Sequence, residues 1–120
     1  MKCRYTRCPH GGEVDREEAV QDGQKYYHPD CKQKVDARKA IVDVIHEINP
    51  NIVYAELGKV LNKLLYEREL GFEFMLRAVK YAKYAGINIY RGATLYNLVN
   101  NPNFLKYNDK YKAKHGEDNI

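Results

Sequence analysis

The residues of this 120-residue chain best suited to chemistry are three cysteines and one histidine near its start. Cys3 and Cys8 are separated by four residues and His28 and Cys31 by two, with nineteen residues between the pairs. Thiolate and imidazole suit a tetrahedral zinc ion, and side chains three positions apart at a helix start lie on one face. The spacing therefore predicts a zinc site formed by these four residues. Because four protein ligands leave no open coordination position, the predicted ion is structural rather than catalytic.

Two alternatives to this ligand set remain open. The four-residue spacer after Cys3 is longer than that of the commonest zinc knuckles, so His10 is an alternative ligand in place of Cys3. The three cysteines could also be unrelated thiols, with His28 in a core. An odd number of cysteines and a reducing cytosol both disfavour disulfides, and a segment this short needs a metal or a similar constraint to fold. A metal therefore accounts best for the segment.

No set of residues in the sequence points to catalysis. The chain contains no serine, and a cysteine nucleophile is not available if all three cysteines bind metal. His46-Glu47 begins like the zinc-protease motif His-Glu-x-x-His, but Pro50 stands where the second histidine is required. The sequence therefore predicts a non-enzymatic protein without a small-molecule substrate. His46 is predicted to be a helix residue at the solvent edge.

Basic and aromatic residues are mixed toward the end of the chain. The net charge is +4, and residues 80–120 carry seven Lys and Arg against three Asp and Glu. Such a mixture can neutralise phosphates and stack on bases, and a tyrosine-rich surface can equally bind a protein. The alternative is that the tyrosines, which fall at helical spacing, close a small core. The candidate nucleic-acid or partner-binding residues are Lys80, Lys83, Tyr84, Arg91, Lys106, Lys110 and Lys112.

The elements that must position these residues follow from local signals. Asp22-Gly23 predicts a hairpin turn between strands at 14–20 and 24–28. Pro29 suits the first turn of a helix, Asn51 suits the N-terminal cap of a second, and Gly86 suits the C-terminal cap of a third. From these signals and from apolar residues at helical spacing we predict helices over 29–48, 52–70, 72–85, 94–99 and from 102 onward, and a short strand over 87–90.

These elements predict an α+β protein that is mostly α, with a treble-clef-like zinc knuckle and a β-hairpin followed by a small helical bundle. The predicted parts are a zinc-binding module at 1–34, a helical domain at 35–112 and a flexible tail at 113–120. The sequence has no run of 18 apolar residues, and no apolar stretch follows its first positive charges. We therefore expect a cytoplasmic protein without a membrane span or a secretory signal.

One segment carries a resemblance to a known group of proteins. The stretch from Gly23 to Cys31, with the cysteine pair before it and helices after it, resembles small treble-clef-like zinc-finger accessory proteins of phages of Gram-positive bacteria. The stretch from Gly71 to Tyr81 is similar to the helix that follows in that group. The resemblance implies a metal role for Cys3, Cys8, His28 and Cys31. Some members are similar to recombination directionality factors, which bind a large serine integrase and switch it from integration to excision.

The leading hypothesis is a zinc-stabilised, phage-type accessory protein that binds and redirects a larger protein, with integrase directionality control as its specific form. The alternative is a nucleic-acid-binding regulator that uses the basic, tyrosine-rich C-terminal half. The two hypotheses differ in their expected response to salt. Phosphate binding weakens steeply as salt is added, whereas a tyrosine-rich protein interface weakens little.

Overall fold

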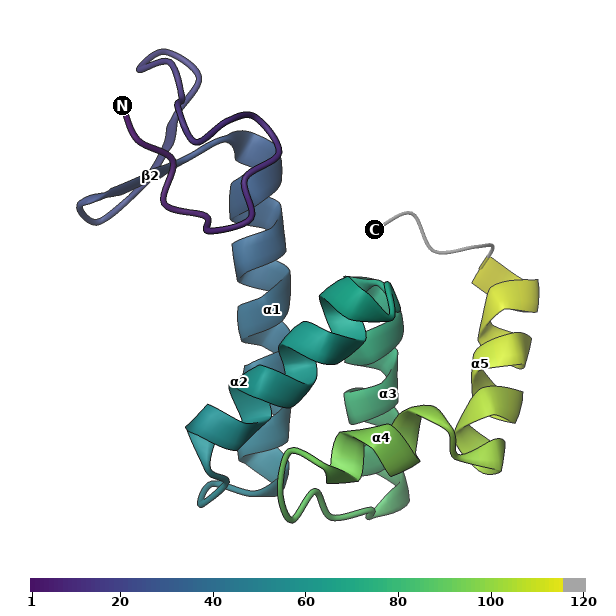
Figure 1. Ribbon diagram of the computed structural model, residues 1–120. Coiled ribbons are helices and arrows are strands. Elements are labelled where there is room, and N and C mark those ends of the chain that lie inside the picture. The colour runs from purple at the N-terminus through teal and green to yellow at the C-terminus, as the bar shows by residue number, and fades with distance from the viewer. Residues whose placement is uncertain (116–120) are drawn as a thin grey trace. The chain divides into compact units, whose positions relative to one another are not determined.

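The computed structural model describes residues 1–115, apart from the side chain of His115. The chain forms two compact units, Met1–Lys39 and Ala40–Ile120 (Figure 1). The boundary between them lies inside helix α1 (Pro29–Ile48), whereas the sequence predicts it at residue 34. Helix α5 (Pro102–His115) takes in the first residues of the predicted tail at 113–120, and residues 116–120 lie outside the described part. The expected mostly helical fold with an N-terminal hairpin is confirmed.

The first unit is built on a short antiparallel hairpin. Strands β1 (Val20–Asp22) and β2 (Lys25–Tyr27) pair with Val20 opposite Tyr27, and Gly23 adopts a φ of 62° in the turn between them. The predicted strand over 14–20 is wrong except for its last residue. Asp15 accepts hydrogen bonds at its carbonyl oxygen from the N–H groups of Glu18 (3.0 Å) and Ala19 (2.9 Å), so the chain turns there before it can join the sheet.

Helix α1 begins and ends where the sequence predicts. Pro29 is its first residue, a position whose N–H would have no helical partner in any case. Asn49 follows the last residue, and its side-chain oxygen accepts a hydrogen bond of 3.1 Å from the N–H of Asn51. The predicted capping role of Asn51 is therefore wrong, because Asn51 is part of the turn and helix α2 (Tyr54–Asn62) begins after extended Val53.

The second unit consists of helices and loops. Helix α2 widens into a π-helical turn, η1 (Lys63–Glu67), and is followed by α3 (Phe72–Ala85), α4 (Thr94–Val99) and α5. The predicted 52–70 helix is therefore shorter than expected, and the predicted 72–85 and 94–99 helices are confirmed. Gly86 caps α3 with a φ of 72°, as predicted. None of the described helices is long and apolar enough to cross a membrane.

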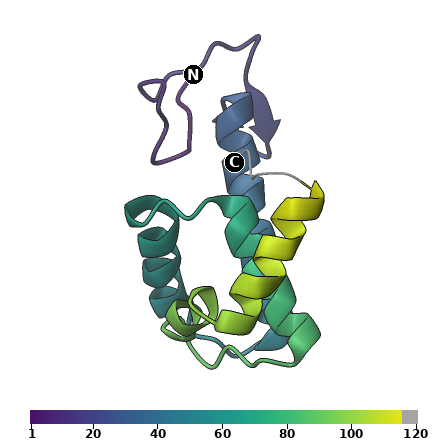
Figure 2. The ribbon, with the colours of Figure 1, turned by 90° about the vertical axis from the view of Figure 1, so that its right-hand side faces the viewer.

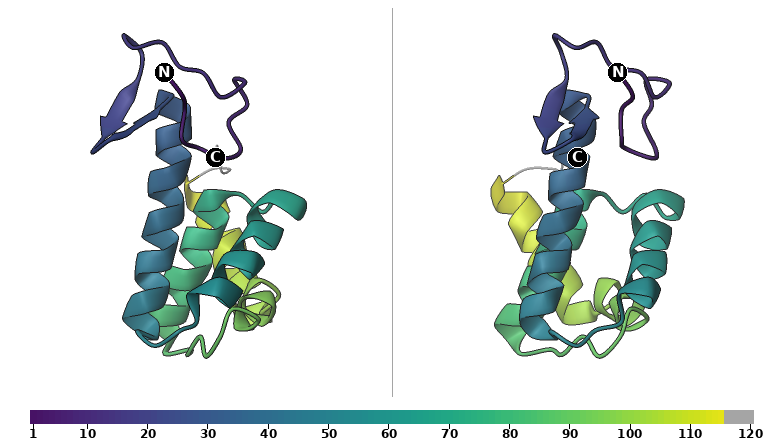
Figure 3. Two further views of the ribbon diagram at one scale, coloured as in Figure 1. Left: turned by 60° about the vertical axis from the view of Figure 1, so that its left-hand side comes forward. Right: turned by 90° about the vertical axis from the view of Figure 1, so that its left-hand side faces the viewer.

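The predicted strand over 87–90 does not form. The side-chain amide of Asn49 donates hydrogen bonds to the carbonyl oxygens of Ile89 (3.0 Å) and Tyr90 (3.2 Å), so a side chain takes the place that a neighbouring strand would fill. Figure 3 shows the two loops at the same end of the helices. The alternation of apolar and polar residues here instead places Ile89 in the core and leaves Tyr90 exposed.

The core of the second unit lies among its helices. Helix α3 packs against both α4 and α5, and Figure 2 shows α5 running beside α3. Phe104 is fully buried, and its ring lies 5.4 Å from that of Phe74 and 5.6 Å from that of Tyr81, measured between ring centroids. The largest fully buried side chains of this unit are Ile41, Ile45, Leu57, Leu61, Leu64, Met75, Val79, Ile89, Leu95 and Phe104.

The loop at Gly92 packs closely on helix α2. A Cβ atom at Gly92 would lie 3.0 Å from backbone atoms of Glu56 and Leu57, which cannot turn aside as the end of a side chain can. We therefore expect Gly92→Ala to lower the free energy of unfolding of the second unit by about 1–3 kcal/mol. Urea denaturation followed by far-UV circular dichroism measures this. Exposed Asn88 of the same loop provides the control, since Asn88→Ala should change the value by less than about 0.5 kcal/mol. Equal effects of the two substitutions would contradict the packing described.

Candidate metal centre

The structure brings the four sequence-predicted ligands together. Cys3 comes from the N-terminal segment, Cys8 from the loop after it, His28 from the residue just before α1, and Cys31 from the first turn of α1. The sulfur atoms and one ring nitrogen all lie within 4.8 Å of one another. His28 turns its Nδ1 atom toward the sulfurs, 3.3 Å from Sγ of Cys8 and 3.9 Å from Sγ of Cys31. This group of donor atoms can hold one metal ion.

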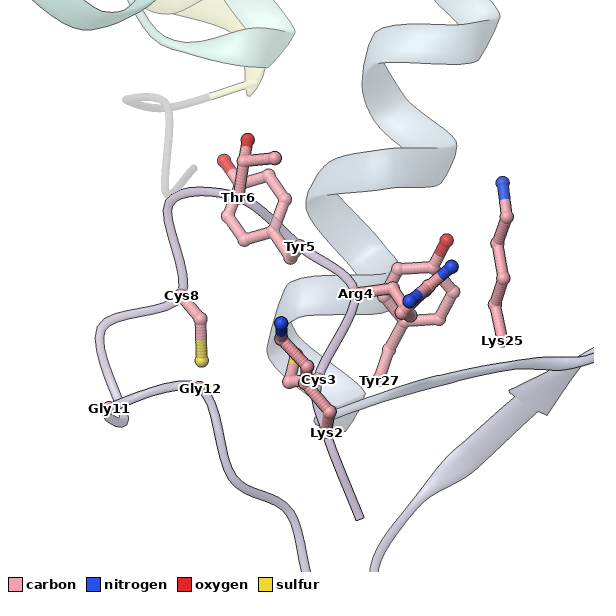
Figure 4. Close-up of a pocket in the computed structure, with 10 residues that line it drawn as sticks. All are labelled: Lys2, Cys3, Arg4, Tyr5, Thr6, Cys8, Gly11, Gly12, Lys25 and Tyr27. Carbon is pink, nitrogen blue, oxygen red and sulfur yellow. The ribbon is translucent and has the colours of Figure 1, made fainter.

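Backbone hydrogen bonds fix the two N-terminal cysteines. The N–H of Cys3 donates to the carbonyl oxygen of Gly12 at 2.7 Å, and the N–H of Cys8 donates to that of Tyr5 at 3.2 Å. Gly11 and Gly12 both have a φ of 84°, a conformation that residues with a Cβ rarely adopt. The loop can therefore fold back on itself, and Figure 4 shows Cys8 and Gly12 facing each other across it.

Two thiols of the cluster, Cys8 and Cys31, differ strongly in acidity. Burial raises the pKa of the Cys8 thiol, but hydrogen bonds from the backbone N–H groups of His10 and Gly12 outweigh it, and the pKa falls to about 7. Burial, reinforced by the nearby sulfurs of Cys8 and Cys3, raises the pKa of Cys31 to about 12. A metal ion that coordinated these thiols would deprotonate them.

His10 lies beside the cluster and belongs to a different group of donors. Its Nε2 atom is 2.8 Å from a carboxylate oxygen of Asp30, and its ring contacts that of His28 at a tilt of 43°, with 4.4 Å between centroids. The hydrogen bond with His10 is the main cause that lowers the pKa of Asp30. The four-donor group thus contains Cys3, and His10 belongs to a second group, with Asp30, that shares Cys31 with the first. His10 supports the ring of a ligand in this arrangement, which the spacing alone could not show.

The candidate metal ligands also make up much of the core of the first unit. Its buried cluster consists of Cys3, Val14, Tyr27 and Cys31, and two of these four are candidate ligands. Tyr5 and Val35 pack against the cluster from its edge. A core this small supplies little apolar burial, so the unit depends on whatever holds the four donor atoms together.

The candidate binding residues of the C-terminal half lie on three separate elements. They are exposed, and they occupy α3 (Lys80, Lys83 and Tyr84), the loop before α4 (Arg91) and α5 (Lys106, Lys110 and Lys112). Lys83 forms an ion pair with Glu47, which reduces its availability to a ligand. Lys80 lines a cavity of about 250 Å³ together with Tyr107 and Tyr111. The tyrosines divide between core and surface: Tyr81 packs on Phe104, whereas Tyr84 is 90% exposed.

Two polar arrangements in the second unit have no signal in the sequence. Arg77 is buried, and its Nε atom donates a hydrogen bond of 2.9 Å to the side-chain oxygen of Asn108, 31 residues away. His46 is hydrogen-bonded at Nδ1 to the hydroxyl of Tyr54 at 3.0 Å, and its Nε2 atom is buried without a hydrogen-bond partner among the residues that the structure describes. The side chain of His46 is half-buried, which agrees with the predicted position at the solvent edge. Both arrangements depend on contacts between different helices.

Comparison of the chain with protein-family models, curated proteins and solved structures finds no match. The function of the chain must therefore be inferred from its own residues and their geometry.

Proposed function

We propose that the first unit is a structural zinc module whose ligands are Cys3, Cys8, His28 and Cys31. A tetrahedral zinc ion with Zn–S bonds of about 2.3 Å and Zn–N bonds of about 2.0 Å places sulfur and nitrogen roughly 3.5 Å apart. The two sulfur-to-Nδ1 distances, 3.3 Å and 3.9 Å, lie on either side of that value. This agreement between donor type, number and spacing is the single observation that carries the proposal.

The donor set favours a structural role for the ion. Three thiolates and one neutral imidazole complete the coordination, so no position is left for water or substrate. Because Cys3 and Cys31 are also buried core residues, the ion would stabilise the module directly. The three cysteines form no disulfide among the described residues, and thiolate ligands persist in a reducing compartment. We accordingly place the protein in the cytoplasm.

We propose further that the protein is a non-enzymatic accessory protein that acts by binding a larger protein. Tyrosine is enriched in protein interfaces, and the helical unit exposes three tyrosines strongly: Tyr54 (62%), Tyr84 (90%) and Tyr90 (75%). The specific function that we propose is that of a phage-type recombination directionality factor, whose partner is a large serine integrase. This choice rests on the resemblance of the segment from Gly23 to Cys31.

A second candidate function is a nucleic-acid-binding regulator. It is favoured by the exposed Lys106, Lys110 and Lys112 of helix α5. The dependence of affinity on salt separates the two candidates. Each phosphate that a protein neutralises makes the affinity fall more steeply as the salt concentration rises. A complex whose affinity stays nearly constant with added salt therefore excludes an interface dominated by phosphates.

The test of the zinc module is removal of the metal from the whole chain. We expect native mass spectrometry in a reducing buffer to find one zinc ion per chain. A strong chelator should remove the ion and unfold residues 1–39, while the helices of the second unit persist. Amide NMR spectra with and without the chelator report the two units separately. Absence of zinc, or loss of the ion without any change in the signals of residues 1–39, would contradict the proposal.

A further inference from the structure

Two loops at the same end of the helical unit carry exposed apolar side chains (Figure 3). The loop after α1 leads into α2, and the loop after α3 packs on the first turn of α2 at Gly92. Asn49 joins the two loops through its hydrogen bonds to the carbonyl oxygens of Ile89 and Tyr90. The exposed side chains at this end include four that together we name the tyrosine surface: Val53 (61%), Tyr54 (62%), Tyr90 (75%) and Arg91.

The side chain of Tyr54 is held in place although most of it is exposed. Its hydroxyl is hydrogen-bonded to Nδ1 of His46 at 3.0 Å, and the two rings meet edge to face with 4.5 Å between centroids. The loop that carries Tyr90 is fixed as well, because the carboxylate of Glu56 accepts a hydrogen bond of 3.3 Å from the N–H of Ala93. Groups that are ordered before binding lose little conformational entropy when a partner covers them. The tyrosine surface is therefore preorganised for contact.

The residue types of the tyrosine surface are those of protein interfaces. Tyrosine and arginine are enriched where binding energy is concentrated, and lysine and glutamate are depleted there. Across the segments 50–55 and 88–92, Arg91 is the only charged residue. A nucleic acid is held by several cations that neutralise its phosphates, so these segments do not supply such a site.

The charge of the tyrosine surface indicates what its partner carries. Arg91 forms no ion pair with any residue that the structure describes. The carboxylate of Glu56 is engaged by the N–H of Ala93. A cation that an interface covers needs a carboxylate opposite it, because leaving it unpaired out of water is costly. A second copy of the chain, docked on the same surface by a two-fold axis, would bring a second Arg91 and no carboxylate of the surface, so like charges would meet.

We infer that the tyrosine surface docks a different protein through an apolar segment of that partner that carries a carboxylate. The guanidinium of Arg91 binds the carboxylate with two parallel hydrogen bonds, and Tyr54 and Tyr90 cover the apolar side chains around it. The inference rests on the proposed function, because it assumes that the protein acts by binding another. It adds the place of contact and the chemistry of the partner.

A yeast-displayed library of random peptides of about 15 residues tests the chemistry of the partner. Peptides are selected on the full native chain and, in parallel, on the variant Arg91→Glu. We expect the native chain to enrich aspartate or glutamate among leucine, isoleucine and phenylalanine. The variant Arg91→Glu should enrich lysine or arginine instead, because the charge at the centre of the contact is reversed. Selected peptides with the same charge on both proteins would contradict the inference.

The affinities of the selected peptides then locate the contact. The first variant carries Tyr90→Ala and Arg91→Glu, and the matched control carries Tyr107→Ala and Lys110→Glu on α5, so each loses one exposed tyrosine and reverses one cation. By fluorescence anisotropy, Kd should rise at least about 10-fold in the first variant and less than about 2-fold in the control. Far-UV circular dichroism checks that both variants fold. If the first does not, Arg91→Glu alone, at an exposed position, takes its place.

Three further results would overturn the inference. They are the enrichment of no peptide by the native chain, equal weakening by the two double variants, and self-association of the native chain that is lost in the Tyr90→Ala, Arg91→Glu variant. The last would mean that a second copy covers the surface.

Binding of a large serine integrase tests the proposed function separately. If the integrase binds the native chain and the Tyr90→Ala, Arg91→Glu variant equally, the tyrosine surface is wrong and the proposed function stands. If the peptides behave as expected and no integrase binds, the surface stands and the proposed partner is wrong.

Discussion

Replacing Cys31 by serine is expected to abolish zinc binding and to unfold residues 1–39, while most of the helical unit keeps its structure. The hydroxyl of serine is a poor substitute for a thiolate, and Cys31 is both a ligand and a fully buried core residue. Structural zinc contributes an apparent binding free energy of about 10–16 kcal/mol in small finger peptides, so its loss exceeds the stability of a module this size. Zinc stoichiometry by native mass spectrometry and amide NMR of both units measure the effect.

Two further substitutions serve as controls for Cys31→Ser. His28→Cys keeps four donors and should retain zinc, because four cysteines are also a structural zinc set. His10→Ala should retain one zinc ion as well, with an affinity reduced by about 10–100-fold, as is typical when a residue that supports a ligand is removed. Loss of the ion in His10→Ala as complete as in Cys31→Ser would mean that His10 is a ligand. Full zinc content in Cys31→Ser would remove Cys31 from the site.

Replacing Phe104 by alanine is expected to lower the free energy of unfolding of the helical unit by about 3–5 kcal/mol. Phe104 is fully buried on α5, and its contacts with Phe74 and Tyr81 join that helix to α3. The substitution leaves a cavity between α5 and α3 where the ring of Phe104 meets those of Phe74 and Tyr81. A domain of this size has only about 5–15 kcal/mol of net stability, so the loss is a large fraction of the total.

Urea denaturation followed by far-UV circular dichroism measures the effect of Phe104→Ala. Tyr84→Ala is the control, since that side chain is 90% exposed and its loss should change the free energy by less than about 0.5 kcal/mol. Zinc content should stay the same in both variants, because the ligands belong to the other unit. A change of less than about 1 kcal/mol in Phe104→Ala would show that α5 contributes little to the stability of this unit.

The predictions that held are those governed by local chemistry. Pro29 sets the start of α1 and Gly86 the end of α3, because each position needs a backbone conformation that few residues supply. The clustering of Cys3, Cys8, His28 and Cys31 was predictable for the same reason: thiol and imidazole are rare donors, and the spacing of His28 and Cys31 matches one turn of helix. Local signals of this kind need no knowledge of the rest of the fold.

The predictions that failed depend on partners far away in the sequence. The segment 87–90 has the alternation of a strand, but its backbone is bound by the side chain of Asn49, which no pattern near the segment reveals. The place of His10 beside His28 follows from the closing of a loop around two glycines. The role of the candidate binding residues of the C-terminal half stays a prediction, and the structure places them on α3, the loop before α4 and α5.

The π-helical turn after α2 has a consequence for how the sequence of this protein compares with others. A turn of this kind holds one more residue than a regular helical turn, as the hydrogen bond from the N–H of Arg68 to the carbonyl oxygen of Lys63 shows. Both Leu64 and Leu65 are buried within it, so the extra residue is packed rather than looped out. A related chain can therefore lack one residue between Lys63 and Glu67 and keep the same fold with an unbroken α-helix. An alignment of such chains should place its single-residue gap there, inside a helix, rather than in the neighbouring loops.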